Sequence, residues 1–250
     1  MANRRTFITA AALTAFSYCS ITAANAVLVA EWNFDGTYAD AFWGAGSSFT
    51  GTSFGNYLAE VGAGTMFGIR TNTQTNVTWT RPTGNGTRTS ASGIGLSAND
   101  TYWEFNVSTI NLKDLLISYD QVSSNTGPRN WKLQYKVGAG SYVDVASYNI
   151  GYNSAGATLA WASSAVRTES QLNFNLSSIA ALNNKASVFL RVLIAGTQQY
   201  NPTATAAFGT AGSTRIDSIK INATAVPEPE SVLILAAGAA IAATRKRSRK

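Results

Sequence analysis

The clearest evidence for the fold class is the segment Trp131-Lys132-Leu133-Gln134-Tyr135-Lys136-Val137, which is followed by Gly138-Ala139-Gly140. Apolar and polar residues alternate without a break from 131 to 137, which is the period of a β-strand with one buried face. The odd-numbered residues are predicted to face the core and the even-numbered ones to face water. The glycine-rich segment permits a tight reversal into Tyr142-Val143-Asp144-Val145, so the sequence predicts a β-hairpin.

Short strand patterns recur along the chain, separated by residues that form turns. Strands are predicted at 28–34, 77–80, 102–107, 115–121, 131–137, 142–145, 172–176, 188–194 and 215–221. Helical periodicity is scarce, and one capped helical turn is expected at 177–182. Short strands joined by polar loops favour two packed antiparallel sheets over an alternating α/β arrangement. The sequence therefore predicts an all-β protein, with an antiparallel β-sandwich at 27–225 between two targeting segments.

The composition excludes several classes of enzyme. The chain has 250 residues, 45% of them hydrophobic and 13% charged, so it is able to bury a sizeable core. It contains no histidine. Ser-His-Asp and Cys-His nucleophile systems and histidine-ligated zinc, iron or haem are therefore excluded.

The net charge of +6 comes from the two ends of the chain rather than from its body. Seven of the 19 basic residues lie in the first 26 and last 25 positions, which leaves 12 basic against 11 acidic residues in between. A near-neutral body lacks the basic face that nucleic-acid binding requires. No nucleic-acid partner is predicted.

The first 26 residues are typical of a secretory signal peptide. Arg4-Arg5 gives a basic start, an apolar stretch follows at 7–16, and Ala24-Asn25-Ala26 is a small-residue cleavage site. Export by Sec-type machinery is expected, with a mature chain that starts at Val27. The alternative is a buried amphipathic N-terminal helix. The one cysteine is Cys19, so the mature chain would contain neither a disulfide nor a thiol.

The last 25 residues combine three features in a fixed order. Val226-Pro227-Glu228-Pro229 is a stiff, extended spacer, an apolar run follows at 232–243, and a basic cluster ends the chain. That cluster consists of Arg245, Lys246, Arg247, Arg249 and Lys250. The positive-inside effect would hold this stop-transfer cluster in the cytoplasm while the apolar run enters the membrane. As a helix the run spans about 18 Å, against a hydrocarbon core of about 30 Å, so the predicted transmembrane helix is short for a permanent anchor.

This end of the chain resembles the PEP-CTERM sorting signal of Gram-negative bacteria, with Pro227-Glu228-Pro229 matching the Pro-Glu-Pro motif. The resemblance covers 226–250, and the apolar run departs from the family pattern in being rich in alanine rather than leucine. It implies that an exosortase, a membrane-embedded cysteine protease, recognises the motif and removes the tail. The protein would be anchored transiently in the inner membrane and end at the cell surface or outside the cell. The alternative is an ordinary C-terminal membrane anchor.

A second resemblance concerns the body. The segments 102–107, 131–140, 174–176, 188–191 and 214–219 are together similar to jelly-roll modules of secreted bacterial proteins, an architecture that carbohydrate-binding modules share. The likeness is a pattern rather than a diagnostic motif, and fold alone does not settle function. It implies a jelly-roll-like sandwich that associates with exopolysaccharide.

Two kinds of candidate site stand out in the body. Trp43, Trp79 and Trp161 lie in turn-rich or irregular segments and are candidate ligand-stacking residues, because indole rings pack against the apolar faces of sugars. The alternative for each tryptophan is a place in the core. Glu31 in the first strand and Asp217 in the last would lie side by side if the terminal strands pair, and could hold a structural calcium ion. The alternative is two solvated carboxylates, and no other cofactor is expected.

Catalysis by a carboxylate pair is the hydrolytic mechanism that needs neither histidine nor cysteine. The available carboxylates are those of Glu60, Asp100, Glu104, Asp114, Asp120 and Glu169. Their spacing selects no pair, so no catalytic residue is predicted. The sequence favours an exported, non-catalytic surface or matrix protein. The alternatives are a secreted carbohydrate-active hydrolase and a purely structural surface protein.

Overall fold

The computed structural model describes residues 26–35, 39, 41–42, 48–71, 77–80, 90–150, 167–201 and 206–226. The described residues form strands β1 to β14 and two short 3-10 helices. The strands are β1 (Ala26–Trp32), β2 (Ser48–Gly51), β3 (Ser53–Leu58), β4 (Val61–Gly62), β5 (Thr65–Arg70), β6 (Val77–Thr80), β7 (Ala91–Ile94), β8 (Thr101–Val107), β9 (Leu112–Ser123), β10 (Asn130–Val137), β11 (Val143–Asn149), β12 (Gln171–Asn175), β13 (Val188–Ile194) and β14 (Ser213–Ala225). The 3-10 helices are η1 (Thr168–Ser170) and η2 (Ala180–Leu182).

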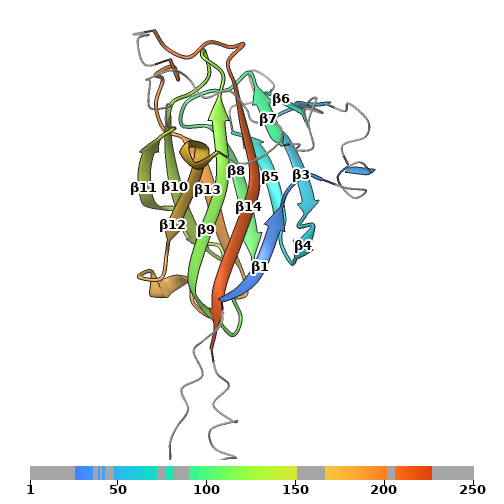
Figure 1. Cartoon of the computed structure of the whole chain (residues 1–250), viewed down its shortest axis with the longest axis vertical. Coiled ribbons are helices and arrows are strands. Elements are labelled where there is room, and N and C mark those ends of the chain that lie inside the picture. Colours follow the sequence, from blue (N-terminus) through green and yellow to red (C-terminus); the bar gives the residue numbers. More distant parts are fainter. Residues whose placement is uncertain are drawn as a thin grey trace, which may run out of the picture.

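The strands form two antiparallel sheets, which lie against each other in Figure 1. Sheet A has the order β12-β9-β14-β7-β6-β2, and β1 pairs with both β14 and β4. Sheet B has the order β11-β10-β13-β8-β5-β3. The long strand β14 pairs with β1 over one half of its length and with β7 over the other half. This arrangement confirms the predicted all-β, antiparallel sandwich class and supplies the strand order that the sequence left open.

Aromatic side chains join the two sheets through the core. Trp32 of β1 packs on Phe105 of β8, with ring centroids 5.3 Å apart. Trp79 of β6 meets Trp103 of β8 edge to face at 6.4 Å. Within sheet B, Trp103 stacks on Trp131 of β10 at 5.6 Å and an interplanar angle of 13°. Rings of this size bury large apolar areas, so these contacts hold the sheets face to face.

All nine predicted strands are present, and those at 77–80 and 188–194 have the predicted bounds. The hairpin is confirmed as well, because β10 pairs antiparallel with β11 through a turn in which Gly138 adopts a φ of 53°. On β10, Trp131 and Leu133 are 1% and 0% exposed, as the alternation predicts. The expected turn at 177–182 is a 3-10 turn, η2. The sequence did not predict β2 to β5 or β7.

The predicted targeting segments at 1–26 and 226–250 lie almost entirely outside the described residues. Ala26 and Val226 belong to the described part, at the start of β1 and just after β14. The signal peptide, the Pro-Glu-Pro motif and the basic cluster therefore remain predictions. Within the described ranges, no helix has the length and hydropathy needed to cross a bilayer, and the apolar run at 232–243 is not part of those ranges.

Candidate functional site

The outer face of sheet B carries a continuous row of polar side chains. On β10 the residues that alternate with the buried tryptophan and leucine point away from the core. Residues that pair directly across neighbouring strands lie on the same face of the sheet, so the strand registers identify which residues belong to this row. It runs from Asp144 on β11 through Gln134, Arg191 and Glu104 to Phe67 on β5. We call this the central row.

Two flanking rows complete the outer face. On one side of the central row the registers join Lys136, Phe189, Asn106 and Thr65. On the other side they join Ser147, Lys132, Leu193, Tyr102 and Ile69. Polar, charged and aromatic groups therefore alternate over five adjacent strands of one sheet.

Hydrogen bonds link the central row from strand to strand. Lys132 forms an ion pair of 2.8 Å with Asp144, which also accepts a hydrogen bond from the amide of Gln134. The Gln134 oxygen in turn accepts a 2.5 Å hydrogen bond from Nε of Arg191. Gln134 is only 8% exposed, so its predicted contact with water is wrong. It lies on the outer face but is enclosed by these neighbours.

Tyr142 extends this network across the sheet from the turn before β11. Its hydroxyl donates a hydrogen bond to Glu104 of β8, and its ring lies over Arg191, whose Cζ is 3.6 Å from the ring centroid. The Arg191 guanidinium is also 4.9 Å from the ring of Tyr102. The ammonium of Lys136 lies 4.1 Å from the centroid of Phe189 and 4.8 Å from that of Tyr142. Three rings and two cations are thus held together on one face.

Hydrogen bonding shifts the pKa of Asp144 and burial shifts that of Tyr142. Hydrogen bonds from Lys132 and Gln134 lower the pKa of Asp144, so this carboxylate is ionised at neutral pH. Burial, together with the hydrogen bond to Glu104 and the charge of that carboxylate, raises the pKa of Tyr142 far above its usual range. Tyr142 is therefore a neutral hydrogen-bond donor under all physiological conditions.

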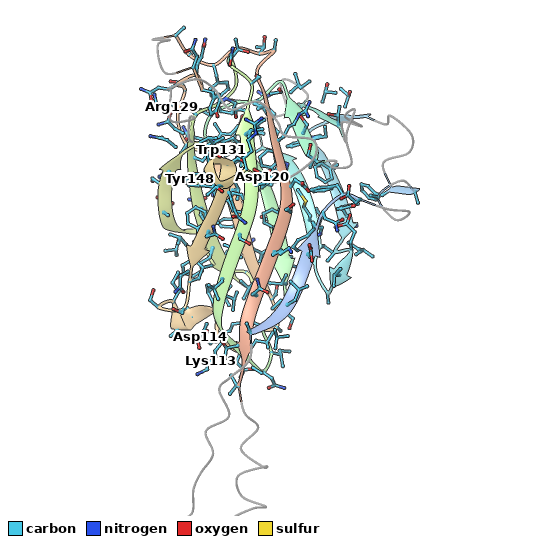
Figure 2. The ribbon with its side chains drawn as sticks, viewed as in Figure 1. Lys113, Asp114, Asp120, Arg129, Trp131 and Tyr148 are labelled. Atoms are coloured by element: carbon cyan, nitrogen blue, oxygen red, sulfur yellow. The ribbon has the colours of Figure 1, made fainter. Side chains whose placement is uncertain are left out.

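A hollow of about 340 Å³ lies beside the network on the β10–β11 side of sheet B. It is lined by Asn130, Trp131, Lys132, Ser147, Tyr148, Asn149 and Ala195. Figure 2 places Trp131 and Tyr148 towards the upper end of the sandwich, away from Lys113 and Asp114. The side-chain oxygen of Asn130 is buried and accepts no hydrogen bond from the described part of the chain.

A larger cleft of about 780 Å³ opens at the other end of the sandwich, where β1 begins. Mostly apolar residues line it, among them Val27, Val29, Leu58 and Val107. Leu58 is 51% exposed there. The cleft offers few hydrogen-bonding groups, whereas the outer face of sheet B combines rings with donors and acceptors. We therefore take the outer face of sheet B as the candidate functional site.

The structure contradicts the prediction that Trp79 stacks on a ligand. Trp79 is 1% exposed and packs edge to face on Phe54, with ring centroids 5.3 Å apart. It is a core residue because β6 turns Val77 and Trp79 to the inner side of sheet A. The other two candidates, Trp43 and Trp161, lie outside the described residues.

The structure also contradicts the calcium site predicted at Glu31 and Asp217. The terminal strands do pair, as that prediction required, but the register sets Glu31 opposite Lys220, and the two form an ion pair of 3.3 Å. Asp217 pairs instead with Asp120 of β9. Among the described residues, no group of three or more acidic residues or cysteines could hold a metal ion.

The carboxylates considered for catalysis are dispersed over the described part of the sandwich. Asp100 lies 3.7 Å from Arg70, and Glu60 accepts hydrogen bonds from the Asn33 amide and the Tyr57 hydroxyl. Burial raises the pKa of Glu60 despite these bonds. Glu104 lies in sheet B, whereas Asp114 and Asp120 lie in sheet A. Asp114 forms an ion pair with Lys113, and Glu169 lies in η1.

Sequence reasoning assigned no functional role to Tyr102, Tyr142 or Arg191. Alternation within 188–194 indicates that Arg191 faces outward, since Leu190 and Val192 are apolar. The outward orientation of Arg191 could therefore have been predicted from the sequence. The contacts of Tyr142 with Glu104 and Arg191 were not, because they depend on the order of β10, β13 and β8 in the sheet.

No protein-family model and no curated protein matches the sequence. Among solved structures, the chain is similar to TmCBM61 in complex with beta-1,4-galactotriose, at 9% identity and a TM-score of 0.32 over 58% of this chain and 80% of that chain. It is also similar to the K2 cleaved adhesin domain of Lys-gingipain, at 13% identity and a TM-score of 0.35, over 70% of this chain and 97% of that chain. It is also similar to an exo-beta-agarase, at 9% identity and a TM-score of 0.30, over 77% of this chain and 25% of that chain. Likeness at this level says nothing about what this chain binds.

Proposed function

We propose that this chain is an exported, non-catalytic protein of the cell exterior that binds exopolysaccharide through the outer face of sheet B. Its body is a jelly-roll-like sandwich, and its C-terminal tail is a PEP-CTERM sorting signal that an exosortase removes. The observation that carries the binding proposal is the arrangement around Tyr142, where three rings and a chain of hydrogen-bonded side chains lie on one face.

Sugar binding needs both components of this face. A ring packs against the C–H surface of a pyranose at a low cost in conformational entropy, and neighbouring polar groups bond its hydroxyls. Gln134 and Glu104, each 8% exposed, hold Arg191 and Tyr142 in position before a ligand arrives, which reduces the cost of ordering these two side chains. Tyr142 lies in the turn before β11, but Arg191, Lys136 and Glu104 lie on strands, and groups on strands are held more precisely than groups on loops.

The binding proposal predicts that Tyr142→Ala loses polysaccharide affinity by at least about tenfold, the effect of removing one stacking ring from a site. Tyr142→Phe keeps the ring and should retain most of the affinity. The measurement is a glycan array on the full-length protein, followed by titration with the polysaccharide that binds best. Leu116→Ala truncates an exposed side chain of sheet A and serves as the control. Equal affinities of wild type and Tyr142→Ala would contradict the proposal.

The sorting proposal predicts the mass of the protein recovered outside cells that contain an exosortase. The recovered chain should start at Val27 and lack the basic cluster at 245–250, because both ends are removed during export. Intact-mass spectrometry reports both events at once. Pro227→Ala with Pro229→Ala removes the rigidity of the motif and should leave the tail in place. Recovery of chains that still end at Lys250 as the persistent form would refute the sorting proposal without affecting the binding one.

A further inference from the structure

The cations and carboxylates of the candidate site do not balance. The outer face of sheet B carries three cations, Lys132, Lys136 and Arg191, and two carboxylates, Glu104 and Asp144. Lys132 and Asp144 neutralise each other at 2.8 Å. Glu104 accepts a hydrogen bond from Tyr142 and forms no ion pair with any cation of the described residues.

Among the described residues, Lys136 has rings rather than carboxylates as neighbours. Arg191 also lies against two rings, but its charge acts on Asp144 as well. Arg191 is directly opposite Glu104 in the strand register, yet no ion pair joins it to any carboxylate of the described residues. Both cations lie against the Tyr142 ring: Cζ of Arg191 is 3.6 Å from the ring centroid, and Nζ of Lys136 is 4.8 Å from it. A ring attracts a cation through its quadrupole without cancelling the charge. Glu104 lies at the Tyr142 hydroxyl, whereas the ammonium of Lys136 beside the ring keeps a positive charge that no carboxylate of the described residues pairs with.

The other lysines of the described ranges do not share this feature. Lys113 lies 3.6 Å from Asp114 and Lys220 lies 3.3 Å from Glu31, so each is neutralised by a carboxylate. Lys185 has no carboxylate within ion-pair distance among the described residues, but it lies in a loop, with no ring beneath its ammonium. Only Lys136, of these lysines, is both unneutralised and fixed beside the candidate stacking ring.

We propose that the ligand is an acidic polysaccharide, whose sugar ring stacks on Tyr142 while an anionic group, a uronate carboxylate or a sulfate ester, pairs with Lys136. Arg191 adds a second positive charge under the same ring. This inference rests on the proposed function and names the class of ligand for that site. A complementary charge at a partly desolvated cation favours an acidic polymer over a neutral polymer of the same backbone.

The test compares two polymers that differ only in charge: polygalacturonate and its carboxyl-reduced, neutral form. Full-length protein is titrated with each, as wild type and as Lys136→Gln, Lys136→Arg and Lys185→Gln. Wild type should bind polygalacturonate about twofold to fivefold more tightly than the neutral form, the effect of one partly exposed ion pair. Lys136→Gln should abolish this preference, Lys136→Arg should retain it, and Lys185→Gln should not alter it. A sulfated galactan added as a third polymer separates the two anionic groups.

The outcomes separate this inference from the proposed function. Equal affinity of wild type for the charged and neutral polymers would overturn the inference and leave polysaccharide binding intact. The same would follow if Lys185→Gln reduced binding as much as Lys136→Gln, since attraction would then be a long-range effect of net charge. If wild type bound none of these polymers and no glycan on the array, the proposed function would fail. Thermal unfolding of each variant confirms that the fold is unchanged.

Discussion

Trp103→Ala is expected to lower the free energy of unfolding by about 3–5 kcal/mol, the cost of removing a large aromatic side chain from a core. Trp103 is 1% exposed and lies at the centre of the stacked and edge-to-face contacts with Trp131 and Trp79. These neighbours come from both sheets, so the sandwich cannot close around the missing ring without moving strands. The cavity would therefore remain largely open.

Urea unfolding monitored by far-UV circular dichroism measures this effect. Leu116→Ala is the control, because Leu116 lies on β9 and is 42% exposed, so its truncation should change stability by no more than about 0.5 kcal/mol. A loss below about 1 kcal/mol for Trp103→Ala would mean that the tryptophan contacts contribute little beyond what the remaining core supplies.

The strands that the sequence predicts are those whose alternation is unbroken. β3 shows why others escape notice: its two buried residues, Phe54 and Tyr57, are three positions apart, and the register with β5 shifts between them. Such a bulge breaks the two-residue period on which strand prediction depends. The segment 48–71 also contains many small and polar residues, a composition that favours the prediction of turns over strands.

Trp79 is a different case, because the signal was present in the sequence. The predicted strand Val77-Thr78-Trp79-Thr80 alternates apolar and polar residues, which places Val77 and Trp79 on the same face and favours burial of both. The turn-rich flanks suggested exposure instead. The structure shows that alternation within a strand is the stronger indicator, since both residues are buried.

The candidate site was predictable only in part. The outward orientation of Lys132 and Lys136 follows from the pattern of β10, but the row that joins Gln134 to Arg191 and Glu104 exists only because β10 and β8 both pair with β13. Strands that are neighbours in a sheet are separated here by dozens of residues, so no local pattern reports their register. The correction of the Glu31–Asp217 site has the same cause.

Gly62→Ala is expected to cost about 2–5 kcal/mol, the combined effect of a left-handed backbone and an overpacked contact. Gly62 has a φ of +79°, and a Cβ added there would lie 2.2 Å from the backbone oxygen of Val29. That oxygen accepts the 2.9 Å hydrogen bond from the Ala63 amide. The contact is with backbone rather than with a flexible side chain, so relief requires β4 to separate from β1. The sequence could not reveal this, because β4 itself was not predicted.

Gly138→Ala separates the two contributions. Gly138 is also left-handed, at a φ of +53°, but an added Cβ would meet nothing within 4 Å, so only the conformational cost of about 1–2 kcal/mol applies. Urea unfolding of both variants should therefore place Gly62→Ala clearly below Gly138→Ala in stability. If both variants lost the same unfolding free energy, the contact between β1 and β4 would be able to adjust to the added Cβ without a loss of stability. In that case the contact between these strands would not be a constraint on the fold, and the left-handed turn alone would explain the glycine.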